Sequence, residues 1–218
     1  MNRFTRSETA ATAAEFALVL PIALIFFFGI IDTGRYMWDV NQVEKAVQVG
    51  ARVAVTTNAV VGGLDDADFG TACGGLEIGD TIDCTDAMPP ITCSATACSA
   101  QDGDCGPVDC DTFRAPAFNN IFTRINRIAP FVSPQQVSVT YSAAGLGYYG
   151  DPACFGERTK AAGGCDTGEL PDIAPLTTVT IAGAPFRPTI LAFADIGMRL
   201  PTRSYSLTLE DGRGTFAY

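Results

Sequence analysis

The apolar run Ala13–Ile31 constrains this chain more than any other feature of its sequence. One carboxylate, Glu15, stands near its start, and one proline, Pro21, lies inside it. The charge-free part, Phe16–Ile31, reaches about 24 Å as a helix, which is short of a ~30 Å hydrocarbon core. Including Ala13–Glu15 brings the length to about 28 Å, so a full span draws Glu15 to the interface or just below it. The run predicts one membrane span over residues 13–31.

The flanks of the run predict its orientation. The basic residues upstream are Arg3 and Arg6, and a short positive flank stays cytoplasmic. We therefore expect residues 1–12 in the cytoplasm and the C-terminal domain on the exported side. A cleaved secretory signal would end in a small-x-small site, whereas bulky residues follow Gly29, which favours a retained single-pass helix.

The helix is expected to continue beyond the membrane. Apolar residues recur at spacings of three and four with charged residues between them, at Val40, Val43, Val47, Ala51 and Ala54. One helix is predicted over 13–56, with an amphipathic half over 32–56 that packs one stripe on a soluble domain. Pro21 removes a backbone hydrogen bond and predicts a bend, although a proline simply tolerated in a membrane anchor is an equal alternative.

The order of residues along this helix is distinctive. It begins with the small residues Ala10-Ala-Thr-Ala-Ala, the pair Glu15-Phe16 and the aliphatic segment from Ala17 to Pro21. Further along the helix come Gly29, then Asp32-Thr-Gly34-Arg35, and then Gly50-Ala51-Arg52. This pattern resembles the N-terminal module of TadE-like proteins, pilin-like components of the tight-adherence (Tad/Flp) pilus machinery. The resemblance covers about the first 55 residues, and related Tad components share it.

The resemblance implies roles for particular residues. Glu15, with Phe16 and Pro21, would belong to a helix-packing surface on which the carboxylate neutralises an amino group or backbone end of a neighbouring subunit. The alternative is that Glu15 marks the interface and is solvated by headgroups. Prepilin-type peptidases would cut between Ala10 and Ala11, where the usual pattern has glycine before the cut. Alanine is small enough for cleavage, whereas the missing glycine counts against it, so both fates stay open.

The cysteines indicate the compartment. All eight lie beyond the anchor, at Cys73, Cys84, Cys93, Cys98, Cys105, Cys110, Cys154 and Cys165. An even set on the exported side predicts disulfides formed in an oxidising periplasm. Cys154 and Cys165 bracket a Gly-rich loop and are the favoured single pair, while Cys93/Cys98 and Cys105/Cys110 share a Cys-x4-Cys spacing. This spacing is not typical of a short zinc site, and the chain has no histidine.

The negative charge gathers in one segment. The chain has a net charge of −10, and no lysine or arginine lies between Arg52 and Arg114. The same interval holds the acidic residues Asp65, Asp66, Asp68, Glu77, Asp80, Asp83, Asp86, Asp102, Asp104, Asp109 and Asp111. We expect residues 57–113 to form an irregular, disulfide-rich insertion. Calcium binding, with Asp102-Gly-Asp104 as the nearest ligand pair, is the alternative to a solvated acidic loop. Nucleic acid is a poor partner because no basic stripe exists.

The ectodomain core is expected in residues 114–218. An amphipathic helix over Ala117–Ala129 precedes three alternating segments, Val137–Tyr141, Thr178–Ala182 and Tyr205–Leu209. The apolar connection Thr189–Leu200 is too short for a second span, so it either covers the sheet or lies at the membrane surface. The predicted fold is α+β and pilin-like, with a long N-terminal helix packed on a small antiparallel sheet.

Two functions follow from these observations. The absence of histidine excludes Ser-His-Asp and Cys-His catalysis within the chain, and no cofactor is expected. The first function is a non-enzymatic, membrane-anchored, pilin-like (minor pseudopilin) component of a Tad-type pilus or secretion apparatus in the bacterial inner membrane. Its partners would be pilus machinery, other pilin-like subunits and the lipid bilayer. The alternative is a membrane-tethered module whose acidic loop binds calcium or an extracellular ligand.

Overall fold

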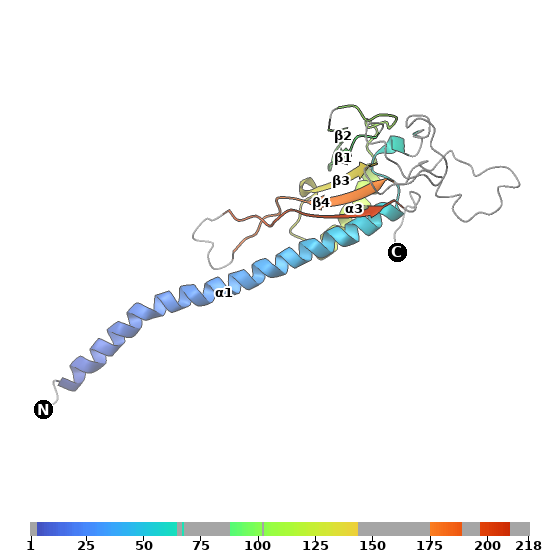
Figure 1. Cartoon of the computed structure of the whole chain (residues 1–218). Helices are drawn as coiled ribbons and strands as arrows, with labels where there is room; N and C mark the ends of the chain where they lie inside the picture. Colours follow the sequence, from blue (N-terminus) through green and yellow to red (C-terminus); the bar gives the residue numbers. More distant parts are fainter. Residues whose placement is uncertain are drawn as a thin grey trace, which may run out of the picture. The chain divides into compact units, whose positions relative to one another are not determined.

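Helix α1, Phe4–Thr56, is the longest element of the structure. The computed structural model describes residues 4–64, 67, 88–101, 103–143, 175–188 and 197–209. The helix confirms the expected one and begins nine residues earlier, at Phe4 instead of residue 13. The blue N-terminal part of the helix changes direction (Figure 1), and Pro21 lies inside the helix.

The chain divides into two compact units by its internal contacts. One unit combines residues 1–41 with 185–200, and the other combines 42–184 with 201–218. Helix α1 therefore supplies residues 4–41, which include the candidate span and the start of the amphipathic half, to the first unit, and residues 42–56 to the second. The expected membrane-side and soluble halves of the helix thus have different packing partners.

The second unit contains a five-stranded antiparallel sheet in the order β2-β1-β3-β4-β5 (Figure 1). Its strands are β1 (Ile91–Cys93), β2 (Cys98–Ala100), β3 (Val137–Ser142), β4 (Leu176–Ile181) and β5 (Arg203–Thr208). Val139 pairs with Val179, and Val179 pairs with Tyr205. Buried and partly exposed residues alternate along β3 and β4, as expected for strands with one face on a core. The three strands predicted from alternation are confirmed within about two residues.

The core lies between this sheet and two helices. Helix α3, Ala115–Ile128, begins beside Pro116 and ends before Pro130, and it buries Phe118, Ile121 and Ile125. On α1 the buried stripe includes Val43, Ala46, Val47, Ala51 and Ala54. Gly50 marks the closest approach, because a Cβ there would lie 2.9 Å from Ile125 Cδ1 and 3.3 Å from Val179 Cγ1. Helices α1 and α3 and strand β4 meet at this point.

The segment between the helices differs from the irregular insertion expected over 57–113. After α1 come the 3₁₀ turn η1 (Gly62–Leu64) and then strands β1 and β2, which extend the sheet beside β3. Val60, Leu64 and Ile91 are fully buried. The Arg114 backbone N–H donates to Val60 O, and its Nη2 donates to Gly62 O, each at 2.8 Å. The segment joins the core because its few apolar residues sit beside the open edge of β3. A second turn, η2 (Pro134–Gln136), leads directly into β3.

Several expectations fall outside the described residues. These are the acidic residues from Asp65 to Asp86 (Asp65, Asp66, Asp68, Glu77, Asp80, Asp83, Asp86), Asp102, the cysteines Cys73, Cys84, Cys154 and Cys165, and residues 189–196 of the apolar connection. The favoured Cys154/Cys165 pair is therefore untested.

Candidate helix-packing and membrane-exit site

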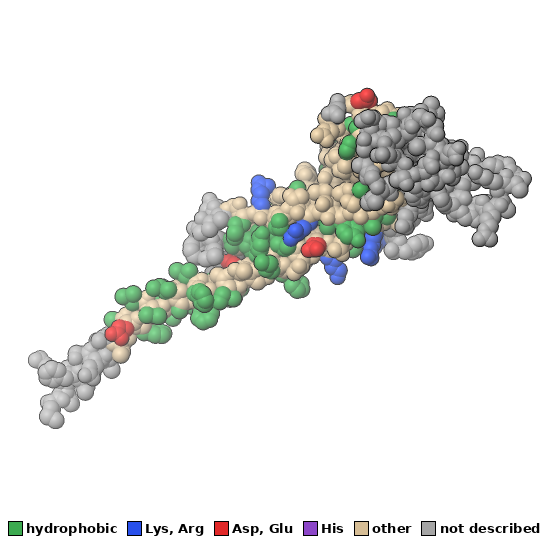
Figure 2. All heavy atoms as spheres, in the orientation of Figure 1, with side chains coloured by type: hydrophobic (Ala, Val, Ile, Leu, Met, Phe, Trp, Pro, Cys, Tyr) green, Lys and Arg blue, Asp and Glu red, His purple; other side chains and the backbone are tan. Residues whose placement is uncertain are grey.

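The membrane-side half of α1 exposes nearly all of its large apolar side chains. Phe16, Ile22 and Phe26 are each about two-thirds exposed, at 66%, 65% and 67%. Within the part of the chain that the structure describes, none of the most apolar 18-residue stretch of the helix is buried. Figure 2 shows these side chains gathered around the N-terminal half of α1. One helix is therefore long and apolar enough to cross a membrane, which fits membrane anchoring.

Glu15 lies on the exposed surface at the start of this stretch. Among the described residues, no hydrogen bond or ion pair reaches its carboxylate. Phe16 and Pro21 are also exposed, and Pro21 lies between the ends of the helix, not at its first turn. The backbone of Ala10 and Ala11 belongs to the same helix. These five residues occupy one continuous helical segment, but the pairing of Glu15 and the processing step stay predictions.

An acidic and a basic residue stand where the apolar run ends. Asp32 comes directly after Ile31 and is only 3% exposed. Its Oδ1 lies 3.6 Å from Nη1 of Arg35, one turn later on the helix. Thr33 Oγ1 donates to the backbone oxygen of Gly29 at 2.7 Å, which satisfies the hydroxyl within the helix. The helix thus changes from fully apolar to charged within about one turn.

A short antiparallel ribbon packs against the helix at this level. Pro185 pairs with Arg199, and Phe186 N–H donates to Met198 O at 3.0 Å. The Phe186 ring meets the Tyr36 ring edge to face, with centroids 5.2 Å apart. The two rings border a cavity of about 200 Å³, and its lining residues are Gly29, Asp32, Thr33, Tyr36, Phe186 and Met198. The ribbon and the helix therefore form one packed junction just after the span.

Asp39 lies in a partly buried position on the helix just beyond Arg35. Burial raises the pKa of the Asp39 carboxyl above its ordinary value, and the nearby Arg35 guanidinium opposes that rise. The direction shows that desolvation outweighs the attraction of Arg35. The helix is thus already partly shielded from water eight residues after the apolar run ends.

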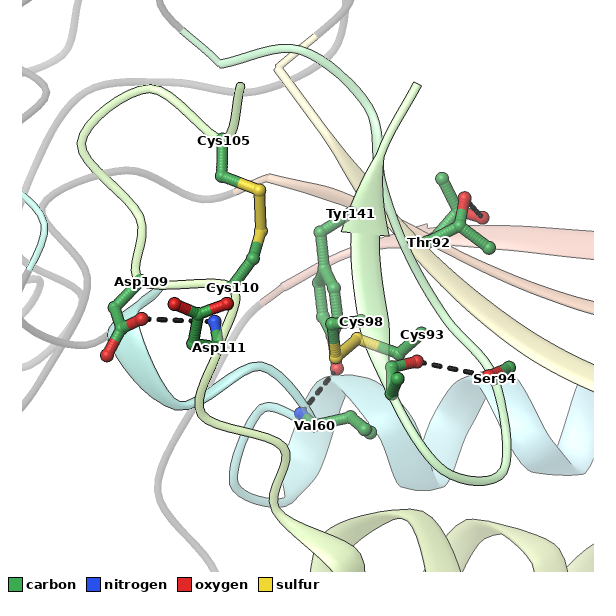
Figure 3. The surroundings of a disulfide bond; sticks show 12 residues. Val60, Thr92, Cys93, Ser94, Cys98, Cys105, Asp109, Cys110, Asp111 and Tyr141 are labelled. Atoms are coloured by element: carbon green, nitrogen blue, oxygen red, sulfur yellow. Dashed lines mark hydrogen bonds between the residues drawn. A yellow bond between two sulfur atoms is a disulfide. The ribbon is translucent and has the colours of Figure 1, made fainter. Parts of the chain in front are cut away.

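The described cysteines are all in disulfides. Cys93 pairs with Cys98 across the β1-β2 hairpin, and Cys105 pairs with Cys110 in the following loop (Figure 3). Each Cys-x4-Cys spacing noted in the sequence is therefore one bridged loop. Disulfide formation was predicted, whereas sequence reasoning left these two partners open. The chain between the partners is short enough for each pair to close locally.

Two acidic side chains of the insertion, Asp104 and Asp109, accept hydrogen bonds from nearby backbone N–H groups. Asp104 Oδ1 accepts from Gly106 N–H, and Asp109 Oδ1 accepts from Asp111 N–H, each at 3.0 Å. Asp109 Oδ2 accepts from Thr112 Oγ1 at the same distance. In the described part of the chain, no three potential metal-ligating side chains gather. These carboxylates act there as turn-forming acceptors.

Sequence reasoning missed the junction around Phe186 and Tyr36. The signal available was an aspartate directly after an apolar run, with arginine three residues later. That signal indicates a helix leaving the membrane, but it contains nothing about a segment 150 residues away. Only tertiary packing places Phe186 and Met198 on this part of the helix.

Comparison with known proteins bears on the same helix. Residues 10–52 match the family described as TadE-like protein. The match includes the exposed apolar stretch, Asp32, Arg35 and Gly50, and it confirms the resemblance seen in the N-terminal residues. No curated protein and no solved structure matches the chain. The family match suggests involvement in the assembly of a Tad pilus.

Proposed function

We propose that this chain, which carries a TadE-like segment over residues 10–52, is a membrane-anchored, pilin-like component in the assembly of a Tad-type pilus or secretion apparatus. Its N-terminal helix packs against the helices of pilin-like subunits or of the pilus machinery. The role is structural, with no catalytic step. The chain is a single-pass protein of the bacterial inner membrane, with its N-terminus in the cytoplasm and its C-terminal domain in the periplasm.

One observation carries this proposal. The family match coincides with a helix whose most apolar stretch is not buried against any described part of the chain. Contiguous exposed apolar surface on this scale is rare in soluble monomers, so lipid or neighbouring helices must cover it. Helices in lipid associate through close packing and buried polar contacts, and both are available along this surface.

Glu15 supplies the polar contact in this proposal. The free energy of inserting a carboxylate is ~2.5–3.5 kcal/mol at the bilayer centre and smaller near the interface. A partner group in a neighbouring subunit would offset this cost and so favour assembly. Its exposed position at the start of the apolar stretch leaves the carboxylate accessible to such a group. Phe16 and Pro21 shape the surrounding surface, because a bulky ring and a bend both decide how closely a second helix approaches.

Site-specific photocrosslinking in cells that make pili tests the proposal. A photoreactive amino acid at Ile22 or Phe26 is expected to capture pilin-like or platform proteins, identified by mass spectrometry. The same probe at Asn126, which is exposed on α3 of the second unit, is the control. Absence of helix-specific partners at Ile22 and Phe26 would contradict the proposed role.

Glu15→Ala tests the carboxylate separately. We expect this variant to abolish pilus assembly while the ectodomain folds normally, since Glu15 is exposed and its carboxylate has no hydrogen bond or ion pair with the described residues. Glu44→Ala, which removes an exposed carboxylate from the soluble half of the same helix, is the matched control. Equal pilus numbers in the two variants would exclude a pairing role for Glu15.

The mass of the mature protein decides between a fibre subunit and a fixed membrane factor. Cleavage between Ala10 and Ala11 would release the helix for incorporation into a fibre, whereas an intact N-terminus keeps the chain in the membrane. Intact-mass measurement of the protein from membranes and from sheared fibres separates the two fates.

A further inference from the structure

The ribbon formed by residues 185–188 and 197–200 has two different faces. In extended backbone, successive side chains point to opposite sides. Phe186 is buried and Met198 lines the cavity beside Tyr36, so this face packs on the helix. The neighbouring residues Arg187 and Arg199 are exposed. The ribbon therefore has an apolar face on α1 and an outer face that carries two arginines.

The packing fixes the depth of this ribbon along the helix. Its helix partners run from Gly29 to Tyr36, and the uncharged run ends at Ile31. At ~1.5 Å per residue, Tyr36 lies only about 8 Å beyond Ile31. This interval corresponds to the headgroup region of a bilayer, where aromatic residues gather. Trp38, the chain's one tryptophan, is 66% exposed in the same region.

Residues of both charge signs lie near this exit. Arg35, Arg187 and Arg199 belong to the same unit as Asp32 and Asp39, in a chain that as a whole carries −10. Arg35 lies near Asp32, and Arg199 also has a contact within the chain. Arg187 is exposed and makes no ion pair with any residue in the described part of the chain. Its guanidinium can thus meet a group from outside the protein.

We infer that the outer face of the ribbon, through Arg187, binds the phosphate of anionic phospholipid headgroups in the periplasmic leaflet. A guanidinium matches phosphate oxygens in a two-pronged hydrogen bond, and its charge attracts an anionic surface. The aromatic packing of Phe186 on Tyr36 holds the arginine at headgroup depth. The ribbon then sets how far α1 is inserted. This inference rests on the membrane anchoring in the proposed function.

Reconstitution of the full chain tests the lipid site. The protein is placed in phosphatidylcholine bilayers that contain phosphatidylglycerol, and spin-labelled forms of both lipids report their relative association with it. In Arg187→Gln the preference for phosphatidylglycerol is expected to fall by up to about fivefold, the typical effect of one interfacial basic residue. Arg127→Gln, which removes an exposed arginine from α3, is the matched control and should retain the preference.

A second readout separates failure of the lipid site from failure of the anchoring. Brominated lipids should quench Trp38 fluorescence in the wild type and in both variants, because each retains the membrane span. If quenching occurs but Arg187→Gln and Arg127→Gln show the same lipid preference, the headgroup site is overturned and the anchoring stands. If Trp38 is not quenched in the wild type, the anchoring is overturned, and the headgroup site with it.

Discussion

Tyr141 links the sheet to the chain that follows α1. Its ring is fully buried on β3, and its hydroxyl oxygen accepts the backbone N–H of Val60 at 2.9 Å (Figure 3). Val60 is also fully buried, so water cannot replace the tyrosine as an acceptor. A single side chain therefore satisfies a backbone donor 81 positions away.

Replacing Tyr141 with phenylalanine should lower the free energy of unfolding by about 1–3 kcal/mol, because the buried Val60 N–H loses its acceptor. Chemical denaturation followed by circular dichroism measures the change. Tyr205→Phe is the control, because Tyr205 is 37% exposed and its loss of a hydroxyl should have little effect. Equal unfolding midpoints for the two variants would contradict this role of Tyr141.

Helix α1 illustrates how one element serves two environments. Its membrane-side half exposes Phe16 and Phe26, whereas its later half buries Val43 and Val47 at 1% exposure. The later half stabilises the second unit by removing these side chains from water, at ~25 cal/mol per Å² of apolar surface. In the described part of the chain, the most apolar stretch of the first half is not buried, which fits the proposed cover by lipid or by other helices.

A charge within the buried stripe should separate the helix from its sheet. Val43→Asp places an unpaired carboxylate at a position that is 1% exposed, with an expected cost of about 3–5 kcal/mol. Limited proteolysis should then cleave the ectodomain rapidly. Asn41→Asp, on the exposed side of the same helix, should leave the digestion pattern unchanged. A protease-resistant Val43→Asp variant would rule out the packed arrangement.

At the scale of the whole molecule, redox state and topology are linked. The described disulfides, Cys93–Cys98 and Cys105–Cys110, lie on the C-terminal side of the candidate span. Disulfides persist in the periplasm, whereas cysteine thiols are kept reduced in the cytosol. The proposed orientation therefore predicts oxidised cysteines in the native protein.

Peptide mapping of the membrane-extracted protein under non-reducing conditions checks this orientation. Peptides linked through Cys93–Cys98 and Cys105–Cys110 are expected, with these four thiols unavailable to alkylation. The same protein reduced before alkylation provides the comparison. Full alkylation without reduction would place the C-terminal domain in the cytosol and reverse the proposed topology.

Local patterns predicted most of the regular elements. The period of three to four residues identified α1 and α3, and alternation identified β3, β4 and β5, because burial on one face imposes these periods. Strands β1 and β2 were missed, since three-residue strands in an acidic segment carry too few positions to establish alternation. The membrane-exit junction was missed because it joins segments that are far apart in the sequence.

The sequence by itself determined the apolar run that forms the candidate span, the position of Glu15 at its start, the amphipathic continuation of the helix and the placement of all cysteines on the C-terminal side of that run. These features depend on the composition and spacing of neighbouring residues. Only the tertiary structure decided that Phe186 packs on Tyr36, that the Tyr141 hydroxyl accepts a hydrogen bond from Val60 N–H, and that the described cysteines pair within each short loop. Such contacts depend on which surfaces meet after the chain collapses, and local periodicity does not specify this.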